Sequence, residues 1–530
     1  MKKKKLKHIE LFAGCGGMSL GLDAAGFELY FANELSPMAG ETFAYNILNE
    51  NLQDKAEMME PSMKVRWVKS KFPSNNLTDR LRENPSTAKD GSYSDIHSIK
   101  DIKNKLLIGD INQLLEFFIA NEDIVSKIVK EKIDLLSGGP PCQSFSLAGK
   151  RERNNKKNLL PLSFARIAGL LQPKVVLLEN VKGITSPFTE DGNKYYAWLE
   201  VSKAFAMQGY VPVCMMLNSK FFGVAQNRPR FILYAFRLDI FNNIFNQRRD
   251  NKILTSSLQF YQRVQEKIDD LGQVDVGDFR YYDIEEDRAL FNGEIFPATT
   301  KAPGKFVSAI EAIGDIRRTK IKYRLSSITN GYGSSLNDVF KNHNGEDVEV
   351  RNHDPREHRF EVKARFRFYQ VINEFQNDLR KSAVDLFTGK DVIGEDLERL
   401  FSEFAEYNLY FSDHEGEHYR RPKSIAEVKQ LIESIPTKKH SQRALLEYEP
   451  APAQLTIPDD LCHYHMETLR TMTVREMARF QSFPDWFEFR SKVTTGGDSR
   501  KFEVPQYTQV GNAVPPLLAK ALGESICELL

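Results

Sequence analysis

The sequence predicts an α/β protein with a mainly parallel, doubly wound sheet into which a mixed domain is inserted. Short apolar runs alternate with helical stretches over residues 7–237, which is the pattern of βαβ units. A similar pattern returns over residues 471–530, whereas residues 238–470 mix charges, aromatic residues and turns without it. We therefore expect one body made of residues 1–237 and 471–530, and a second domain made of residues 238–470.

The length and composition agree with more than one domain. A chain of 530 residues and 60.8 kDa is too long for one compact domain, and a hydrophobic content of 41% supports sizeable cores. The 73 Lys and Arg residues nearly balance the 72 Asp and Glu residues. This balance neither requires nor excludes a nucleic-acid partner, because a neutral total can include a local basic face.

Cysteine usage and hydropathy indicate the compartment. The five cysteines are odd in number and scattered, which favours a reducing cytoplasm over a disulfide framework. No apolar run approaches the roughly 18 residues of a membrane span. Residues 1–5 lack the apolar region of a signal peptide. We expect a cytoplasmic protein with no membrane contact.

The expected strands cover residues 7–13, 27–33, 106–108, 133–137, 174–178, 210–217 and 230–236, of which the last two form a closing pair. Polar or reactive side chains follow four of them, namely Glu34, Asp110, Cys142 and Glu179. In open α/β sheets that edge is where ligands bind. Residues 50–104 are polar and contain several prolines, so we interpret them as an insertion, partly loop.

The later helices have clear signals. Apolar residues recur at helical spacing over residues 361–379, among Arg and Lys residues that we expect to form a solvated face. Thr473 can cap a helix, with Glu476 completing a capping box. A turn over residues 509–516 leads into a helix over residues 517–529.

Cys142 directly follows the turn Gly-Gly-Pro-Pro at residues 138–141. These residues stop the preceding strand and make the turn rigid. A lone cysteine is more often a small buried apolar residue. A packed core does not need such a rigid turn, so we interpret the thiol as placed for chemistry.

A glycine-rich turn over residues 12–17 joins the first strand to a helix, and glycines let the backbone approach a ligand closely. The dinucleotide pattern would need glycine where the chain has Ser19, which disfavours a pyrophosphate site and a nicotinamide oxidoreductase. Glu34 follows at about 20 residues, the spacing at which an acid binds ribose hydroxyls. With Asp110 for an adenine amino group, this describes a nucleoside site that suits S-adenosylmethionine. For the glycines alone, a structural turn stays the alternative.

Two further features carry chemistry. Glu179, beside the Cys142 loop, can serve as general acid to a ring nitrogen, because partial burial would keep it protonated. A solvated loop glutamate is the commoner alternative. Arg228 and Arg230 flank a proline, and their guanidinium groups suit carbonyl oxygens, carboxylates and phosphates. Residues 462–465 (Cys-His-Tyr-His) have no second pair of ligands, so we expect a structural role there and no metal site.

Six motifs occur in an order that resembles the DNA (cytosine-5) methyltransferase family. They lie at residues 12–17, 141–143, 179–181, 226–230, 475–484 and 509–512. The resemblance covers residues 7–237 and about 455–530, and indicates a bacterial restriction-modification type. It implies the class I S-adenosylmethionine-dependent methyltransferase fold, S-adenosylmethionine as cofactor and double-stranded DNA as partner. It also implies that residues 238–470 form a target-recognition domain and that residues 471–530 return to the catalytic domain.

The resemblance also implies a role for each matching residue. Cys142 matches the nucleophile that attacks cytosine C6, and Glu179 matches the acid at N3. Arg228 and Arg230 match the arginine pair near the base. The implied cofactor contacts are Phe12, Ala13, Gly14, Cys15, Gly16, Gly17, Glu34, Leu35, Asp110, Ile111, Pro141, Asn512 and Ala513. The implied DNA contacts are Gln143, Ser146, Lys150 and Arg151.

The chemistry agrees with this resemblance. Cytosine C5 is a poor nucleophile, and addition of a thiolate at C6 makes it enamine-like without a metal. The target base must leave the duplex to be reached. A tRNA cytosine-5 methyltransferase and a catalytically inactive DNA-binding relative are the alternatives; the large second domain disfavours the first and the intact Cys142, Glu179 and arginine pair disfavour the other. We expect a monomer. The sequence leaves open the DNA target and whether a cognate restriction endonuclease acts separately.

Overall fold

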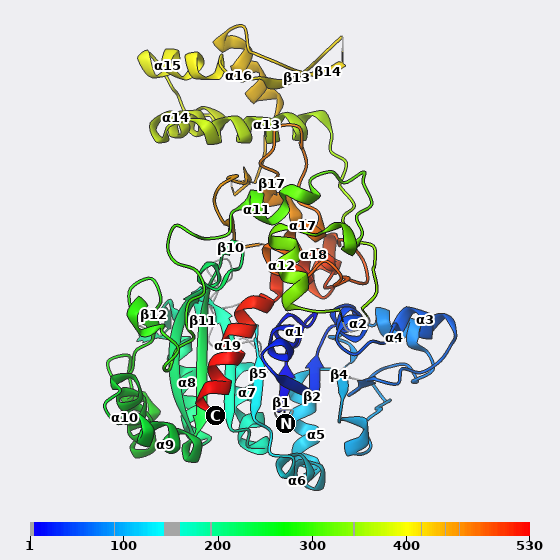
Figure 1. Cartoon of the computed structure of the whole chain (residues 1–530), viewed down its shortest axis with the longest axis vertical. Helices are drawn as coiled ribbons and strands as arrows, with labels where there is room; N and C mark the ends of the chain where they lie inside the picture. Colours follow the sequence, from blue (N-terminus) through cyan, green and yellow to red (C-terminus); the bar gives the residue numbers. More distant parts are fainter. Residues whose placement is uncertain are drawn as a thin grey trace.

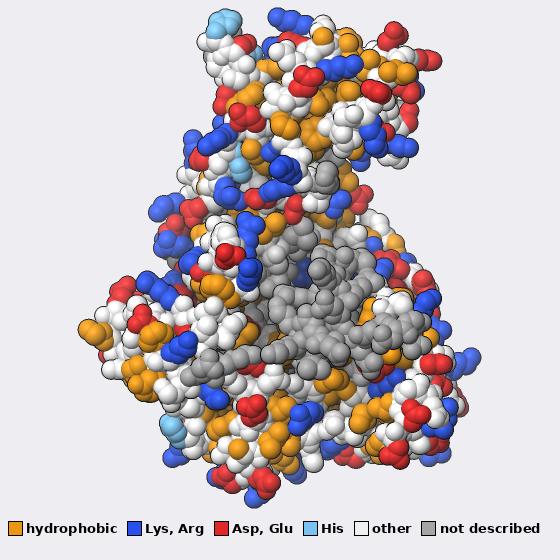
Figure 2. Space-filling model, turned by 180° about the vertical axis from the view of Figure 1, so that it is seen from behind, with side chains coloured by type: hydrophobic (Ala, Val, Ile, Leu, Met, Phe, Trp, Pro, Cys, Tyr) orange, Lys and Arg blue, Asp and Glu red, His pale blue; other side chains and the backbone are white. Residues whose placement is uncertain are grey.

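The computed structural model describes residues 5–88, 91–141, 160–190, 193–342, 345–414, 416–439, 441–454 and 456–530. Five predicted site residues lie outside the described residues: Cys142, Gln143, Ser146, Lys150 and Arg151. The chain forms a lower α/β body and a smaller upper body joined by a neck (Figure 1). Seen from behind, the molecule narrows at the neck and the upper body overhangs it on one side (Figure 2).

The lower body is built on a nine-stranded sheet with the order β12-β9-β11-β6-β5-β1-β2-β4-β3. The strands are β1 Leu6–Leu11, β2 Phe27–Glu34, β3 Val65–Trp67, β4 Lys105–Ile108, β5 Leu135–Gly138, β6 Val175–Val181, β9 Tyr210–Asn218, β11 Pro229–Arg237 and β12 Tyr282–Asp283. Strands β3, β4, β2, β1, β5 and β6 are parallel, and β11 is antiparallel to both β6 and β9. The predicted strands and the closing pair are confirmed. The strand order reverses at β1, which places the ligand crevice beyond the carboxyl ends of β1 and β5.

Helices cover both faces of this sheet because successive strand residues point to opposite faces. Val176 and Leu178 of β6 pack in one core, whereas Val175 and Leu177 pack in the other. The first core includes α5 Ile111–Ala120, α6 Glu122–Lys130, α7 Leu160–Leu171 and α8 Ala197–Met207. The second includes α1 Gly17–Ala24 and α19 Pro516–Leu529. In the described part of the chain, no helix has the length and apolar character needed to cross a membrane.

Helices α1 and α19 lie side by side although they come from opposite ends of the sequence (Figure 1). A Cβ atom added to Gly21 of α1 would lie 2.4 Å from the backbone oxygen of Pro516. Only glycine therefore permits this approach. The C-terminal helix α19 therefore packs directly on the first helix of the lower body.

The stretch from residue 50 to 104, expected to be a partly looped insertion, contributes to the sheet. It forms β3 and the short helices α3 Leu52–Glu57 and α4 Leu77–Arg82. Trp67 and Leu81 pack with β2 and β4 in one core. Arg80 is buried, forms an ion pair with Asp95 and lies 5.0 Å over the ring of Trp67. The sequence prediction missed this strand because three residues are too few to show an apolar period.

The region expected to be one domain, residues 238–470, is divided among several cores. Helices α9 Leu238–Gln247 and α10 Lys252–Glu266 pack on the nine-stranded sheet through Phe241 and Phe260. Helices α11 Ala309–Ile313 and α12 Gly331–Val339 share a core with α17 Val474–Phe480 and α18 Gln506–Asn512. Residues 364–435, together with Ala444 and Cys462, supply a core of their own. The packing on the sheet therefore continues past residue 238, because amphipathic helices cover the sheet after the strands end.

The upper body consists of α13 Phe360–Glu374, α14 Asn377–Phe387, α15 Glu395–Phe404, the hairpin β13 Leu409–Asp413 with β14 Gly416–Arg420, and α16 Ile425–Ser434. The helix expected over residues 361–379 ends at Glu374 and a second helix follows. Arg365 and Arg367 of α13 were expected on a solvated face, but both are buried. Arg365 donates to the carbonyls of Ile435 and Pro436, and Arg367 donates to that of Asn408. The carbonyls of Ile435 and Pro436 follow α16, and that of Asn408 precedes β13. The two arginines of α13 therefore connect this helix to both of these elements.

Candidate active site

The glycine-rich turn and Glu34 face each other at the carboxyl ends of β1 and β2. Gly14 and Gly16 have φ angles of 55° and 98°, so the chain turns sharply before α1. The amides of Gly14 and Ser36 donate to Oε2 and Oε1 of Glu34, each at 2.8 Å. Burial raises the pKa of Glu34, although these amides act in the opposite direction. The carboxyl group is therefore fixed in orientation opposite the turn.

The next strand brings Asp110 to the same edge. The amide of Gly109 donates to the carbonyl oxygen of Glu34 at 2.9 Å, and the Asn33 side chain donates to the carbonyls of Leu107 and Gly109. Asp110 then caps α5 by accepting the amide of Asn112 at 2.8 Å. The predicted proximity of Asp110 to Glu34 therefore holds despite the long segment between them.

The turn is open on one side and closely packed on the other. A Cβ atom on Gly14 would meet nothing within 4 Å, whereas one on Gly17 would lie 2.4 Å from the backbone oxygen of Val514. Leu35 is 42% exposed, and Asn512 is exposed at the C-terminal end of α18, where the turn to α19 begins. A concave backbone, a fixed carboxyl and an exposed apolar side chain form a cradle that fits a nucleoside.

The other predicted residues of this edge are mostly buried. Phe12 is half-buried and packs on Phe164, with 6.2 Å between ring centroids. Ala13, Ile111 and Ala513 are buried. Cys15 is also buried, and burial raises the pKa of its thiol. Its thiol is therefore that of a buried, unreactive cysteine rather than a thiolate.

A buried hydrogen bond explains the serine at position 19. The Ser19 hydroxyl donates to the carboxyl of Glu10 on β1, and both side chains are buried. Burial raises the pKa of Glu10 to about 8, and the nearby Glu34 acts in the same direction. Glu10 was not among the predicted residues, because its partner lies in the next element.

The turn that leads to Cys142 lies against β6. The Asn180 side-chain amide donates to the carbonyl of Pro140 at 2.9 Å. A Cβ atom on Gly139 would lie 3.0 Å from Oε2 of Glu179, so the turn passes directly over that carboxyl. Pro140 is buried and Pro141 is exposed. Asn180 belongs to the 179–181 motif, but the sequence alone indicated no role for it. Its hydrogen-bond partner, Pro140, lies 40 positions away in the sequence.

Glu179 and Arg230 form a buried ion pair. Glu179 was expected just beyond the end of β6 but lies within this strand. It pairs in register with Ile232 of β11. The Nε atom of Arg230 lies 2.7 Å from Oε1 of Glu179, and both residues are 8% exposed. Burial lowers the pKa of Arg230, and Glu179 opposes this shift. The structure thus brings two predicted catalytic residues together.

Arg228 points to a different part of the site. Its Nη2 atom donates to the carbonyls of Gly511 and Ala513, at 2.8 and 3.2 Å. The side chain is 2% exposed, and burial lowers its pKa well below the usual value. Its donors are therefore directed at the turn that carries Asn512.

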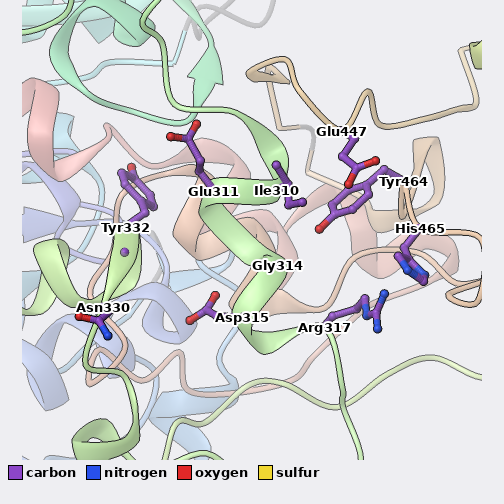
Figure 3. A pocket seen from close by; sticks show the side chains of 11 residues that line it. Ile310, Glu311, Gly314, Asp315, Arg317, Asn330, Tyr332, Glu447, Tyr464 and His465 are labelled. Carbon is purple, nitrogen blue, oxygen red and sulfur yellow. The ribbon is translucent and has the colours of Figure 1, made fainter.

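A pocket of about 290 Å³ lies apart from these residues (Figure 3). It is lined by α11 and the residues that follow it, by the start of α12, and by residues 447, 464 and 465, with Tyr332 and Tyr464 on either side of Gly314. Its carboxylates are Glu311, Asp315 and Glu447, of which Asp315 is already paired with Arg479. None of the predicted site residues lines it.

The comparisons with known proteins agree with the geometry. The mostly parallel nine-stranded sheet with helices on both faces fits the class I methyltransferase fold. The family described as C-5 cytosine-specific DNA methylase matches residues 6–70 and 92–528. The chain belongs to this family and is a DNA (cytosine-5) methyltransferase, which moves a methyl group from a donor to cytosine in DNA. Residues 71–91, within the stretch once expected to be an insertion, fall outside the match.

Similar proteins include two bacterial enzymes. The chain is 25% identical to Type II methyltransferase M.DdeI of Desulfomicrobium norvegicum, over 98% of this chain and 88% of that protein. It is 23% identical to Type II methyltransferase M1.HphI of Haemophilus parahaemolyticus, over 99% of this chain and 87% of that protein. Among solved structures, the Dnmt2 methyltransferase of S. pombe aligns over 99% of this chain and 98% of its own, with 14% identity and a TM-score of 0.41.

Proposed function

We propose that this enzyme transfers the methyl group of S-adenosylmethionine to C5 of a flipped-out cytosine in a specific duplex sequence, with Cys142 as nucleophile. The observation that carries the proposal is the Glu179–Arg230 ion pair, over which the turn leading to Cys142 passes. The cradle around Glu34 lies along the same sheet edge. One edge therefore offers a base site and a nucleoside site.

The nucleoside cradle suits S-adenosylmethionine, which supplies an activated methyl group when bound. Each Glu34 oxygen accepts one amide and keeps a lone pair that can accept a ribose hydroxyl. Leu35 offers an apolar surface to the adenine, and Asp110 can accept from its amino group. Asn512 closes the far side. The open space above Gly14 leaves room for the ligand.

The base site supports covalent catalysis. The Cys142 thiolate adds to cytosine C6, and the displaced electron pair is taken up at N3 by a proton from Glu179, whose carboxyl must therefore be protonated when the base is bound. C5 then takes the methyl group. Loss of the C5 proton and departure of the thiolate restore the aromatic ring. Arg230 orients the Glu179 carboxyl and offers further donors to the O2 oxygen of the base.

Sequence reading is assigned to the upper body, because it has its own core and includes none of the predicted catalytic or cofactor residues. A duplex in the recess beneath the overhanging upper body (Figure 2) can contact both bodies. The Type II names of the relatives support a bacterial, cytoplasmic modification enzyme whose cognate endonuclease acts separately. We propose that it works as a monomer, since both predicted sites lie within one chain.

The proposal is tested by transfer of tritiated methyl groups from S-adenosylmethionine to plasmid DNA and to tRNA in parallel. We expect label in DNA only, and bisulfite sequencing of the plasmid should show one recurring sequence context. The Cys142→Ser variant is the control and should transfer no label. Label in tRNA alone would replace DNA by tRNA as the substrate.

A further inference from the structure

The two arginines of the 226–230 motif, two positions apart, have different partners. Arg230 pairs with Glu179 on the base side, whereas Arg228 donates to the turn after α18. We infer that Arg228 is a positioning residue that fixes the turn carrying Asn512, and that it does not contact the flipped base. The inference rests on the proposed function in one respect, namely that Asn512 contacts the cofactor.

Both terminal nitrogens of the Arg228 guanidinium have oxygen partners, three of them backbone carbonyls, whereas its buried Nε has no hydrogen-bond partner among the described residues. Besides the carbonyls of Gly511 and Ala513, its Nη1 atom donates to Gln454 O and to Gln226 Oε1, each at 3.4 Å. These bonds occupy both terminal nitrogens. The group therefore has no terminal nitrogen directed elsewhere, and a planar fork suits two neighbouring carbonyls better than an ammonium does.

A second side chain holds the same turn. The Gln481 amide donates to the carbonyls of Val510 and Ala513, at 2.7 and 3.5 Å, and its side chain is fully buried. Arg228 and Gln481 thus share the carbonyl of Ala513 and between them hold those of Val510 and Gly511. Asn512, which lies between these carbonyls in sequence, is exposed. The backbone of the turn is fixed from the buried side, and Asn512 is left facing outwards.

The backbone of Arg228 is fixed as well. Its amide donates to Oδ1 of Asn218 at 3.0 Å, and its carbonyl accepts the amide of Ser219 at 3.1 Å. Pro229 then restricts the backbone between the two arginines. A short rigid segment therefore connects the base side of the site to the cofactor turn.

A double-mutant cycle on cofactor binding tests the inference. The dissociation constant of S-adenosylmethionine is measured by calorimetry for the full-length Arg228→Lys, Asn512→Ala and doubly substituted proteins. We expect each single variant to bind the cofactor about tenfold more weakly than the unchanged protein. The double variant should bind no more weakly than the single variant with the larger loss, because the effects of coupled residues do not add. At saturating cofactor, Arg228→Lys should methylate DNA at nearly the normal kcat, with the loss confined to the KM for cofactor.

Two controls separate this role from general destabilisation. Arg365 is also a buried arginine that donates to two backbone carbonyls, but in the upper body. Arg365→Lys should leave cofactor binding unchanged. Arg230→Lys should leave it within about twofold while reducing kcat. If Arg228→Lys does not fold, Arg228→Gln retains amide donors and takes its place.

The outcomes are distinguishable. Unchanged binding in Asn512→Ala would remove Asn512 from the proposed cofactor site, whatever Arg228 does. If Asn512→Ala weakens binding, any of three results would overturn the inference. The losses in the double variant could be additive, Arg228→Lys could bind the cofactor normally, or Arg228→Lys could have a lower kcat at saturating cofactor. The last result would return Arg228 to the base.

Discussion

Nε of Arg230 lies 2.7 Å from Oε1 of Glu179, across the antiparallel pair formed by β11 and β6. The register of the strands sets this relationship, because Arg230 pairs with Val181 and Glu179 pairs with Ile232. The two side chains therefore meet diagonally across the ladder. Any ring placed against Glu179 has a guanidinium beside it.

Replacing Arg230 by lysine should lower kcat by about tenfold or more, because a point charge cannot orient a carboxylate as a planar fork does. The measurement is methyl transfer to DNA at saturating cofactor. Arg237→Lys is the matched control, since Arg237 ends the same strand and pairs with Asp239 near the surface. Equal activity in the two variants would show that Arg230 has no special role.

Cys142 should form a covalent adduct with duplex DNA that contains 5-fluorocytosine at the target, because fluorine at C5 blocks the final loss of a proton. Denaturing gel electrophoresis detects the adduct. Cys142→Ser should abolish it while DNA binding persists. A trapped complex with the serine variant would identify a different nucleophile.

Glu34→Ala should weaken the binding of S-adenosylmethionine by about 1–3 kcal/mol, because the ribose hydroxyls and two backbone amides lose their acceptor. Calorimetry without DNA measures the effect. Glu28→Ala is the control, since Glu28 lies on the same strand and is exposed. Affinity equal to that of the control would exclude Glu34 from the site.

Glu10→Gln should flatten the dependence of stability on pH. The folded-state pKa of Glu10 is raised to about 8, so the unfolded chain ionises first and stability is lost as the pH rises from about 4.5 to 8. A glutamine mimics the protonated carboxyl and removes this contribution. Urea unfolding at pH 5, 6.5 and 8 compares the two proteins. The difference between them should change with pH; a constant difference would contradict the assignment.

Exchanging residues 360–435 for the equivalent segment of a relative should change which sites are methylated. This segment supplies most of the upper body's core, so the exchange leaves in place the core shared with α17 and α18 and the contact of Arg228 with Gln454. Methylome sequencing gives the result. An active chimera with the original target would place specificity elsewhere, and residues 71–91, outside the family match, would be examined next.

The strands and the groups at their ends could be predicted from sequence because both depend on local patterns. An apolar run and its alternation are visible over a few residues, and parallel strands necessarily end at one edge, which brings Glu34 and Asp110 together. The same reasoning located Glu179 within a few residues.

The directions of buried polar side chains could not be predicted in this way. Arg228 donates to a carbonyl 283 positions away, and Arg365 donates to one 71 positions away. From the neighbouring sequence alone, each of these arginines would be interpreted as a solvated or ligand-binding cation. Only the tertiary packing shows that the guanidinium groups are used to hold backbone segments.

The packing of α1 against α19 has a consequence for how the enzyme is assembled. The wall formed by Val514 and Pro516 reaches Gly17 and Gly21 only after nearly the whole sequence has been synthesised. Until then, the apolar face of α1 that includes Met18 and Leu22 lacks its cover. Such distant pairing slows folding and leaves the early segment dependent on protection from aggregation. If the chain were cut between the two bodies, the two fragments would form the proposed cofactor site only when they bind each other. This chain is therefore suited to a split enzyme whose methylation activity reports the association of its fragments.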